Sequence, residues 1–401
     1  MSIKKYAYLF VVFSLSIATL LALINYFIDP YLLFQSKRTP GINEKKPAAA
    51  NYSSLYKPYN VLNVKPQTII VGNSRPEMGI NPESPCWPEK NGIVYNLTFP
   101  GTGTYGQIRE LFQAVAGGQV QNILLGVDFS DFLTNRKEET KEITLSQEYI
   151  DLKNLLMIDE TFIETDKYQL KKIQDYATTL FSLKTLISSF HTLFSQSPNS
   201  VNRTFFGFNP ALDYSEILHR EGAWVLFEQK IPEIKKMFFK TGLSIYQSEQ
   251  WSWELEWIRQ TIKLVIDKNI SLTIFINPYH YIYLETIHDA GYWDDFENFK
   301  RSLTNIVNLY GENKVALWDF ALYSQYTASP APQKNNKTPQ WNWFWEPAHY
   351  KAELGELMLA DIFNSNCTNS HAEPVGIKLN NIDIDNHLNQ QGNLLRLKTS
   401  Y

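Results

Sequence analysis

The chain has 401 residues, of which 44% are hydrophobic and 19% charged, a composition typical of globular rather than disordered proteins. Its formal net charge is −4 and no basic stripe is present, so we expect no nucleic-acid partner. The two cysteines, Cys86 and Cys367, form neither a CxxC pair nor a Cys/His cluster, which argues against a metal site and leaves a single disulfide open. Nothing in the sequence indicates a cofactor.

Residues 1–29 predict a membrane anchor. Lys4 and Lys5 precede an uncharged run, residues 6–28, that as a helix spans about 34 Å, enough to cross the inner membrane. The lysines favour a cytoplasmic N-terminus, so the rest of the chain should lie on the extracytoplasmic side, in the periplasm of a Gram-negative cell. A cleaved signal peptide is the alternative, but the run exceeds a typical h-region and no Ala-x-Ala site closes it.

Residues 30–67 are polar and proline-containing, which predicts a linker or a strap on the surface. Beyond them, short apolar runs alternate with amphipathic helical patterns. The expected strands are Thr68–Val71, Ile93–Leu97, Asn122–Asp128, Ser271–Ile276 and Lys314–Trp318, and the expected helices are Tyr105–Ala116, Trp251–Asp267, Trp293–Tyr310 and Lys351–Phe363. This alternation predicts an α/β fold over residues 68–365, a three-layer sandwich with a mainly parallel sheet.

Two regions depart from the alternation. Residues 130–247, approximately, contain long helical stretches such as Tyr168–Phe194 but no strong strand, and we interpret them as a helical insertion that forms a lid or a substrate wall. Residues 366–401 are rich in asparagine and predict a polar C-terminal tail.

Ser74 is the candidate nucleophile. The apolar strand at 68–71 leads directly into Gly72-Asn73-Ser74, and ligand chemistry in open α/β sheets collects at the carboxyl ends of the strands. A serine in this position also serves as a helix cap, so the motif alone leaves a structural role open. Arg75 could hold an anionic substrate or pair with a carboxylate such as Glu77.

His349 is the candidate base, because it follows the last core strand in a loop before a helix. Glu346, three residues earlier, could orient the other ring nitrogen. His280 and Asp319 also end strands at the same edge and are reserve partners for Ser74.

Three blocks resemble those of the SGNH (GDSL-like) hydrolase superfamily, which has a flavodoxin-like sandwich. They are Gly72-Asn73-Ser74, Asn96-x-Thr98-x-x-Gly101 and Glu346-x-x-His349. The resemblance implies Ser74 as nucleophile, Gly101 as an oxyanion donor, and Glu346 and His349 as orienting acid and base.

The third block departs from the family pattern. Asp128 stands where the family has an asparagine that donates to the oxyanion, and an ionised carboxylate cannot donate. Asp128 could instead pair with Arg75 or bind substrate, and Asn277, after the next strand, could supply the missing amide. Glu346 replaces the usual aspartate and Thr98 the first glycine of the second block.

The anchor and the degenerate third block are similar to membrane-anchored proteins of polysaccharide O-acetylation, related to the alginate O-acetylation proteins and the D-alanyl transfer protein of teichoic acid. This resemblance implies a serine-dependent acyltransferase or esterase acting on O-acyl groups of a cell-envelope or exported polysaccharide. A cell-surface glycan would be the substrate, a membrane acyl-donor protein is a candidate partner, and Trp341, Trp343 and Trp345 could bind sugar or pack the last loop onto the core. The alternatives are a catalytically inactive SGNH-like scaffold or glycan-binding subunit of an envelope polysaccharide complex, and a soluble secreted lipase.

Overall fold

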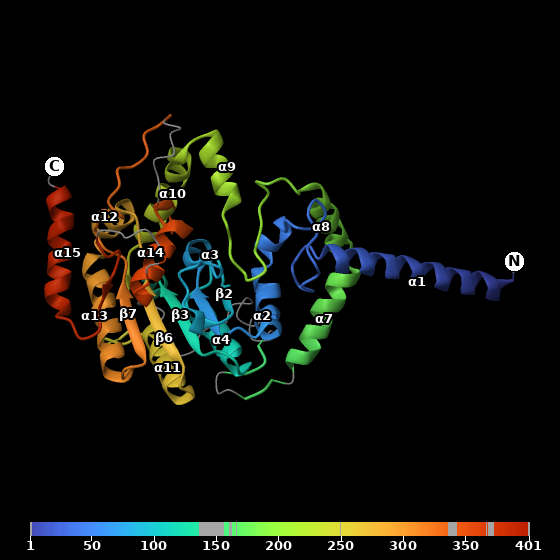
Figure 1. The fold of residues 1–401 in the computed structure, drawn as a ribbon, viewed down its shortest axis with the longest axis horizontal. Coiled ribbons are helices and arrows are strands. Elements are labelled where there is room, and N and C mark those ends of the chain that lie inside the picture. The colour runs from blue at the N-terminus through green and yellow to red at the C-terminus, as the bar shows by residue number, and fades with distance from the viewer. Residues whose placement is uncertain are drawn as a thin grey trace.

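A computed structural model describes residues 2–135, 156–159, 163–165, 167–248, 250–335, 343–365, 367 and 373–399 (Figure 1). Within these ranges the core is a six-stranded sheet in the order β10-β7-β6-β3-β1-β2. The strands are β1 (Thr68–Gly72), β2 (Val94–Thr98), β3 (Asn122–Val127), β6 (Ser271–Ile276), β7 (Val315–Asp319) and β10 (Ile377–Lys378). β10 pairs antiparallel with β7 and the other pairs are parallel, which confirms an α/β fold with a mainly parallel sheet.

Both faces of the sheet are covered by helices. Along β1, Ile69 and Val71 enter one apolar cluster and Ile70 enters the other, as expected for a strand with a period of two buried on both sides. The first cluster is formed with α4 (Thr104–Ala116), α11 (Trp253–Lys268) and α13 (Trp293–Tyr310). The second is formed with α14 (Ala352–Phe363). The expected strands and core helices are therefore present, with ends shifted by a residue or two.

Residues 30–67 are not an open linker. They contain the short 3-10 helix η1 (Pro47–Asn51) and α2 (Ser53–Val64), which packs beside α4 and β2. α2 buries Tyr56, Lys57 and Tyr59, so this segment is part of the folded body. The polar composition of the segment did not indicate burial, because Lys57 is neutralised by Glu77 and bonded to the Thr98 carbonyl, both distant in sequence.

The insertion after β3 is helical, as predicted, over the part that the structure describes. Its elements are α5 (Phe129–Phe132), β4 (Thr134–Asn135), α7 (Lys167–Phe181), α8 (Leu183–Phe194), α9 (Leu212–Arg220), α10 (Ala223–Phe238) and β5 (Leu243–Ser244). The loop between α8 and α9 lies along the edge strand β2, where the Asn96 N–H donates to the Phe206 carbonyl at 2.8 Å. This contact covers an edge that would otherwise be free to pair.

The C-terminal residues also belong to the fold. β10 extends the sheet, and α15 (Ile384–Thr399) packs against α13. A disulfide joins Cys86, after α3 (Ser74–Gly79) and before the 3-10 helix η2 (Glu89–Asn91), to Cys367. A loose polar tail was therefore the wrong expectation for the described part of this region.

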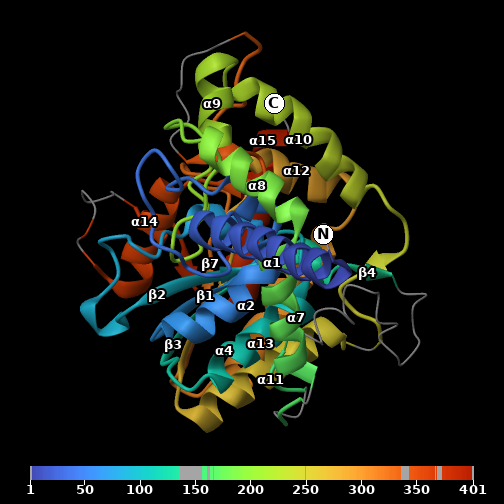
Figure 2. The ribbon, with the colours of Figure 1, turned by 90° about the vertical axis from the view of Figure 1, so that its right-hand side faces the viewer.

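At the other end of the chain, α1 (Ile3–Ile28) projects from the body as a long exposed helix (Figure 1). It is long and apolar enough to cross a membrane. Its carboxyl end contacts α7 and α8, which flank it when the molecule is viewed from that side (Figure 2).

Candidate active site

Ser74 stands at a sharp turn at the carboxyl end of β1. Gly72 has a φ of +150°, and a Cβ there would lie 2.9 Å from the carbonyl oxygen of Gly126, so the turn requires glycine. Asn73 caps α3, because its Oδ1 accepts a hydrogen bond from the Arg75 N–H at 3.0 Å. Ser74 is therefore the first residue of α3 and lies at the sheet edge.

The hairpin of β8 (Phe344–Glu346) and β9 (His349–Tyr350) carries the candidate acid and base. His349 Nε2 lies 2.8 Å from the Ser74 Oγ, and His349 Nδ1 is hydrogen-bonded to Glu346 Oε1. With the proton on Nδ1 donated to the carboxylate, Nε2 faces the hydroxyl as an acceptor. The structure thus brings the three residues into the hydrogen-bonded order of a serine triad.

The environment keeps Glu346 ionised. Burial alone would raise its pKa, but the neighbouring His349 and the Ala348 N–H, which donates to Oε2 at 2.6 Å, hold the pKa of Glu346 below its usual value. In a serine triad, a charged acceptor at this position fixes the ring orientation and stabilises the imidazolium that forms when the serine loses its proton.

Arg75 links the segment of the candidate nucleophile to that of the candidate base. Its Nε donates to the Ala348 carbonyl at 2.8 Å, Nη2 donates to the Tyr283 hydroxyl at 3.0 Å, and Nη1 pairs with Asp128 at 3.0 Å. Burial opposes the charge, but Asp128 outweighs it and raises the pKa of Arg75 above its ordinary range. Arg75 is buried and each of its three guanidinium nitrogens has a partner, so its ion-pair partner is Asp128 rather than Glu77.

Asp128 is the buried centre of this network. Besides Arg75, its carboxylate accepts from Asn73 Nδ2, from Asn277 Nδ2 at 3.1 Å and from the Tyr279 hydroxyl at 2.8 Å. Its side chain is completely buried, which contradicts the expectation that it touches substrate. The carboxylate of the third block holds the sheet edge together and orients the arginine.

Asn277 does not provide the missing oxyanion donor. Both hydrogens of its amide are engaged, with the Val127 carbonyl at 3.2 Å and with Asp128, and its Oδ1 accepts from the Tyr350 hydroxyl at 3.1 Å. The residue is fully buried among these partners. The prediction for Asn277 is therefore wrong, since no N–H of its side chain is left for a substrate.

The backbone near Ser74 offers two candidate oxyanion donors, the N–H groups of Ser74 and Gly101. The N–H of Ser74 opens α3 and has no carbonyl one turn earlier in the helix. Gly101, exposed and with a φ of +71°, is in the turn after β2, and this turn is tied to the nucleophile by a 2.9 Å bond from the Phe99 N–H to the Gly72 carbonyl.

Asp131, in α5, lies beside the Ser74 site, and the sequence pattern did not identify it as a site residue. Its Oδ2 accepts from Asn73 Nδ2 at 3.3 Å and from Gln107 Nε2 at 3.1 Å, and Gln107 also bonds the Thr102 carbonyl. Burial raises the pKa of Asp131 to about 7, and the Asp128 carboxylate adds to the shift. The available signal was an acidic residue three positions after the strand-ending Asp128.

α3 is also held from its far side by buried charges. Glu77 pairs with Lys57 of α2 at 3.0 Å and with Arg203 of the insertion at 3.3 Å. Lys57 also donates to the Thr98 carbonyl at 2.7 Å, and burial lowers its pKa to about 8 against the pull of Glu77. The insertion thereby supports the helix that carries Ser74.

Two of the three clustered tryptophans before His349, Trp343 and Trp345, lie within the described residues, and both pack against other aromatic rings. Trp343 meets Tyr326 edge-on, with ring centroids 5.6 Å apart. Trp345 packs against Tyr214 of α9, and the Lys351 Nζ lies 4.6 Å from its ring centre. Both are only half-buried, so packing accounts for part of each surface; Trp341 lies outside the described residues.

The reserve partners of Ser74 are engaged elsewhere. His280 caps α12 (Tyr281–Asp289) and its Nε2 bonds the Ser329 carbonyl at 2.9 Å. Asp319 is buried with Lys300 at 2.7 Å and His387 at 3.2 Å. Neither is required to complete the chain from Ser74 to Glu346.

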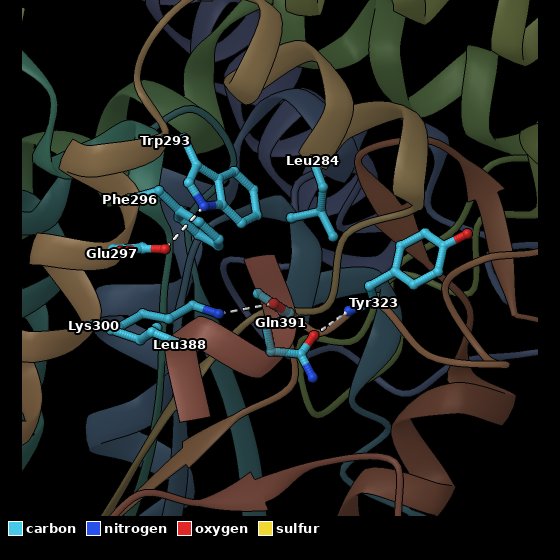
Figure 3. Close-up of a pocket in the computed structure, with 9 residues that line it drawn as sticks. Leu284, Trp293, Phe296, Glu297, Lys300, Tyr323, Leu388 and Gln391 are labelled. Atoms are coloured by element: carbon cyan, nitrogen blue, oxygen red, sulfur yellow. Dashed lines mark hydrogen bonds between the residues drawn. The ribbon is translucent and has the colours of Figure 1, made fainter. Parts of the chain in front are cut away.

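A separate small pocket lies between α12, α13 and α15 and shares no lining residue with the Ser74 site (Figure 3). Its polar groups bond one another or the backbone: Trp293 with Glu297, Lys300 with the Ala321 carbonyl, and Gln391 with the Tyr323 N–H. This pocket presents no unpaired catalytic group.

In the part of the chain that the structure describes, no group of three or more His, Cys, Asp or Glu side chains could hold a metal ion. Compared with known proteins, the chain matches no family model and no curated protein.

Proposed function

We propose that the protein is an extracytoplasmic serine-dependent acyltransferase or esterase acting on O-acyl groups of a cell-envelope or exported polysaccharide. The observation that carries the proposal is the continuous hydrogen-bonded chain from Ser74 through His349 to Glu346. A buried acid, a histidine with its free nitrogen on a serine, and a serine at a strand-to-helix turn together supply an activated nucleophile.

In the proposed reaction, His349 Nε2 takes the proton of the Ser74 hydroxyl as Oγ attacks the acyl carbonyl. The N–H groups of Ser74 and Gly101 would stabilise the oxyanion of the tetrahedral intermediate. Its collapse breaks the ester bond, and His349 protonates the departing alcohol. The acyl group on Ser74 then passes to water in an esterase, or to a sugar hydroxyl in a transferase, with the same proton transfers in reverse order.

The location of the reaction rests on two features. Lys4 and Lys5 before α1 favour a cytoplasmic N-terminus, and the Cys86–Cys367 disulfide fits an oxidising compartment. The glycan substrate rests on the resemblance to anchored proteins of polysaccharide O-acetylation, with the half-buried rings of Trp343 and Trp345 as candidate sugar contacts.

Labelling with a fluorophosphonate tests the nucleophile. We expect one adduct on the wild type, located at Ser74 by peptide mass, and none on the Ser74→Ala variant. Ser197→Ala, which removes an exposed serine of the insertion, is the matched control and should label normally. A wild type without any Ser74-dependent adduct, at normal thermal stability, would overturn the proposal.

A second candidate is a catalytically inactive glycan-binding subunit or scaffold of an envelope polysaccharide complex. One observation favours it: Asp128 and Asn277 are both consumed by the buried network, which leaves the third-block oxyanion donor missing. This alternative predicts binding of an envelope polysaccharide in a pull-down, together with the absence of labelling at Ser74.

A further inference from the structure

The helices α7 and α8 have their polar faces turned inward. The side chains that α7 buries are Tyr168, Asp175 and Thr179, and those that α8 buries are Thr185, Ser189 and Thr192. A surface helix of a water-soluble domain normally directs its apolar stripe to the core and its polar residues to solvent. The two helices show the reverse arrangement.

The outward faces carry large apolar side chains among polar ones. On α8 the exposed large apolar residues follow helical spacing and are Leu183 (69% exposed), Ile187 (71%), Phe190 (45%) and Phe194 (86%); Lys184 and His191 are exposed beside them. On α7 they are Leu170 (70%), Ile173 (66%) and Phe181 (54%). We call these seven side chains the α7–α8 ridge. Large apolar side chains gathered in this way on an exposed surface mark a site that is covered by something else.

Polar bonds fix the ridge to the membrane helix. Asn25, near the end of α1, is buried; its Nδ2 donates to the carbonyls of Thr179, Leu180 and Ser182 at 3.4, 2.9 and 3.3 Å. The Ser189 hydroxyl donates to Asn25 Oδ1 at 3.0 Å. The turn between α7 and α8 therefore lies at the level of Asn25 along α1.

That level coincides with a membrane surface. Tyr6 and Asn25 are 19 positions apart, so they are separated by about 29 Å along the helix, close to the roughly 30 Å hydrocarbon thickness of a bilayer. With α1 across the membrane, Phe181 and Leu183 at the turn would lie at the boundary between acyl chains and headgroups. Figures 1 and 2 show α7 and α8 running crosswise to α1, on the side of the body from which α1 projects.

The charges beside the ridge are positive. α7 and α8 carry Lys167, Lys171, Lys172 and Lys184, whereas their acidic residue, Asp175, is buried and bonded to Lys171 and to Tyr59. Exposed apolar side chains flanked by lysines are typical of helices that lie in the interface of a membrane containing anionic lipids.

We propose that the α7–α8 ridge inserts into the surface of the lipid leaflet that α1 enters at its carboxyl end, so that the body is seated on the bilayer. The occupant of the ridge is thus lipid, continuous with the lipid around α1. Two membrane contacts, α1 and the α7–α8 ridge, then fix the orientation of the body. A single helix with a flexible connection would let the body rotate relative to the bilayer.

Depth-dependent quenching tests this in the full-length protein. Ile187→Cys and Phe194→Cys introduce single free thiols, because the native cysteines are paired. Each is labelled with an environment-sensitive fluorophore after reconstitution in nanodiscs of phosphatidylethanolamine and phosphatidylglycerol. Phe13→Cys within α1 is the positive control, and Leu309→Cys, at an equally exposed leucine of α13, is the matched negative control.

We expect doxyl-labelled lipid to quench the fluorophores at positions 187 and 194 several times more strongly than the one at position 309. With the doxyl group deep in the acyl chain, the fluorophore at position 13 should be quenched more strongly than those at 187 and 194. Replacing phosphatidylglycerol by phosphatidylcholine should weaken the quenching at 187 and 194. Quenching at these positions equal to that at 309 overturns the proposal. Coverage of the ridge by a second copy of the chain, seen as energy transfer between differently labelled protomers, also overturns it. So does coverage of the ridge in native membranes but not in nanodiscs, which would identify a protein partner.

Discussion

Replacing Arg75 by methionine should destabilise the protein strongly. The variant keeps most of the side-chain volume but leaves the buried Asp128 carboxylate without its cation, and it orphans the Ala348 carbonyl and the Tyr283 hydroxyl. Removing one partner of a buried pair costs about 3–5 kcal/mol, because the remaining charge stays buried and uncompensated. We expect the free energy of unfolding to fall by that amount.

A double-mutant cycle separates the ion pair from the rest of the network. Asp128→Asn removes the charge while retaining an acceptor, so adding it to Arg75→Met should cost about 1–3 kcal/mol less than the sum of the single changes. Urea unfolding of the detergent-solubilised protein, followed by tryptophan fluorescence, provides the measurement. Arg259→Met is the control, because its pair with Glu256 lies on the surface of α11, and it should change stability by less than about 1 kcal/mol.

A loss below about 1 kcal/mol for Arg75→Met, or strict additivity with Asp128→Asn, would refute the reasoning that this pair is desolvated and coupled. Phosphonate labelling of Ser74 adds a second readout. Arg75→Lys keeps a cation near Asp128 but cannot reproduce the forked contacts to Ala348 and Tyr283, so labelling should slow even where stability is partly restored.

Three further predictions concern the acid, the disulfide and the site carboxyl. Glu346→Gln should slow phosphonate labelling of Ser74 by about 10³-fold or more, because the ring loses its charged acceptor; an unchanged rate contradicts the positioning role. Replacing both Cys86 and Cys367 by serine should lower the free energy of unfolding by about 2–4 kcal/mol, and reductant should reproduce this in the wild type; equal urea midpoints would count against it. The folded pKa of Asp131, about 7, lies above its ordinary value of 3.8, so the wild type should lose stability as pH rises from 4 to 7. Asp131→Asn should therefore gain about 1–3 kcal/mol over the wild type above pH 8 and nothing near pH 4; a gain that is the same at every pH refutes the assignment.

The strands and the triad candidates could be found from the sequence because they depend on local pattern. A fully apolar run such as Thr68–Val71 has few alternatives to a buried parallel strand, and parallel strands bring their carboxyl ends to one edge. That geometry makes Ser74 a candidate, and the resemblance of the local blocks to SGNH hydrolases adds Glu346 and His349. They required no knowledge of which side chains pair inside the core.

What the sequence could not show depends on partners distant in the chain. Lys57 looks like a solvated linker residue until Glu77, which also pairs with Arg203, neutralises it. Asn277 looks like a free amide until the Val127 carbonyl and Asp128 take its hydrogens. The stretch Tyr168–Phe194 has helical periodicity but no sign of which face is buried. Its division at Ser182, which caps α8, and its inverted packing follow from contacts with α1.

The separation between nucleophile and base has a consequence for the order in which the protein matures. Ser74 and His349 are 275 positions apart, and the disulfide encloses almost the whole interval by joining Cys86 to Cys367. In the proposed extracytoplasmic orientation, a chain translocated N-terminus first presents its serine long before the hairpin with the histidine. Under the proposed function, the serine is an ordinary alcohol until that hairpin docks through Arg75, so a stalled or truncated chain would not react.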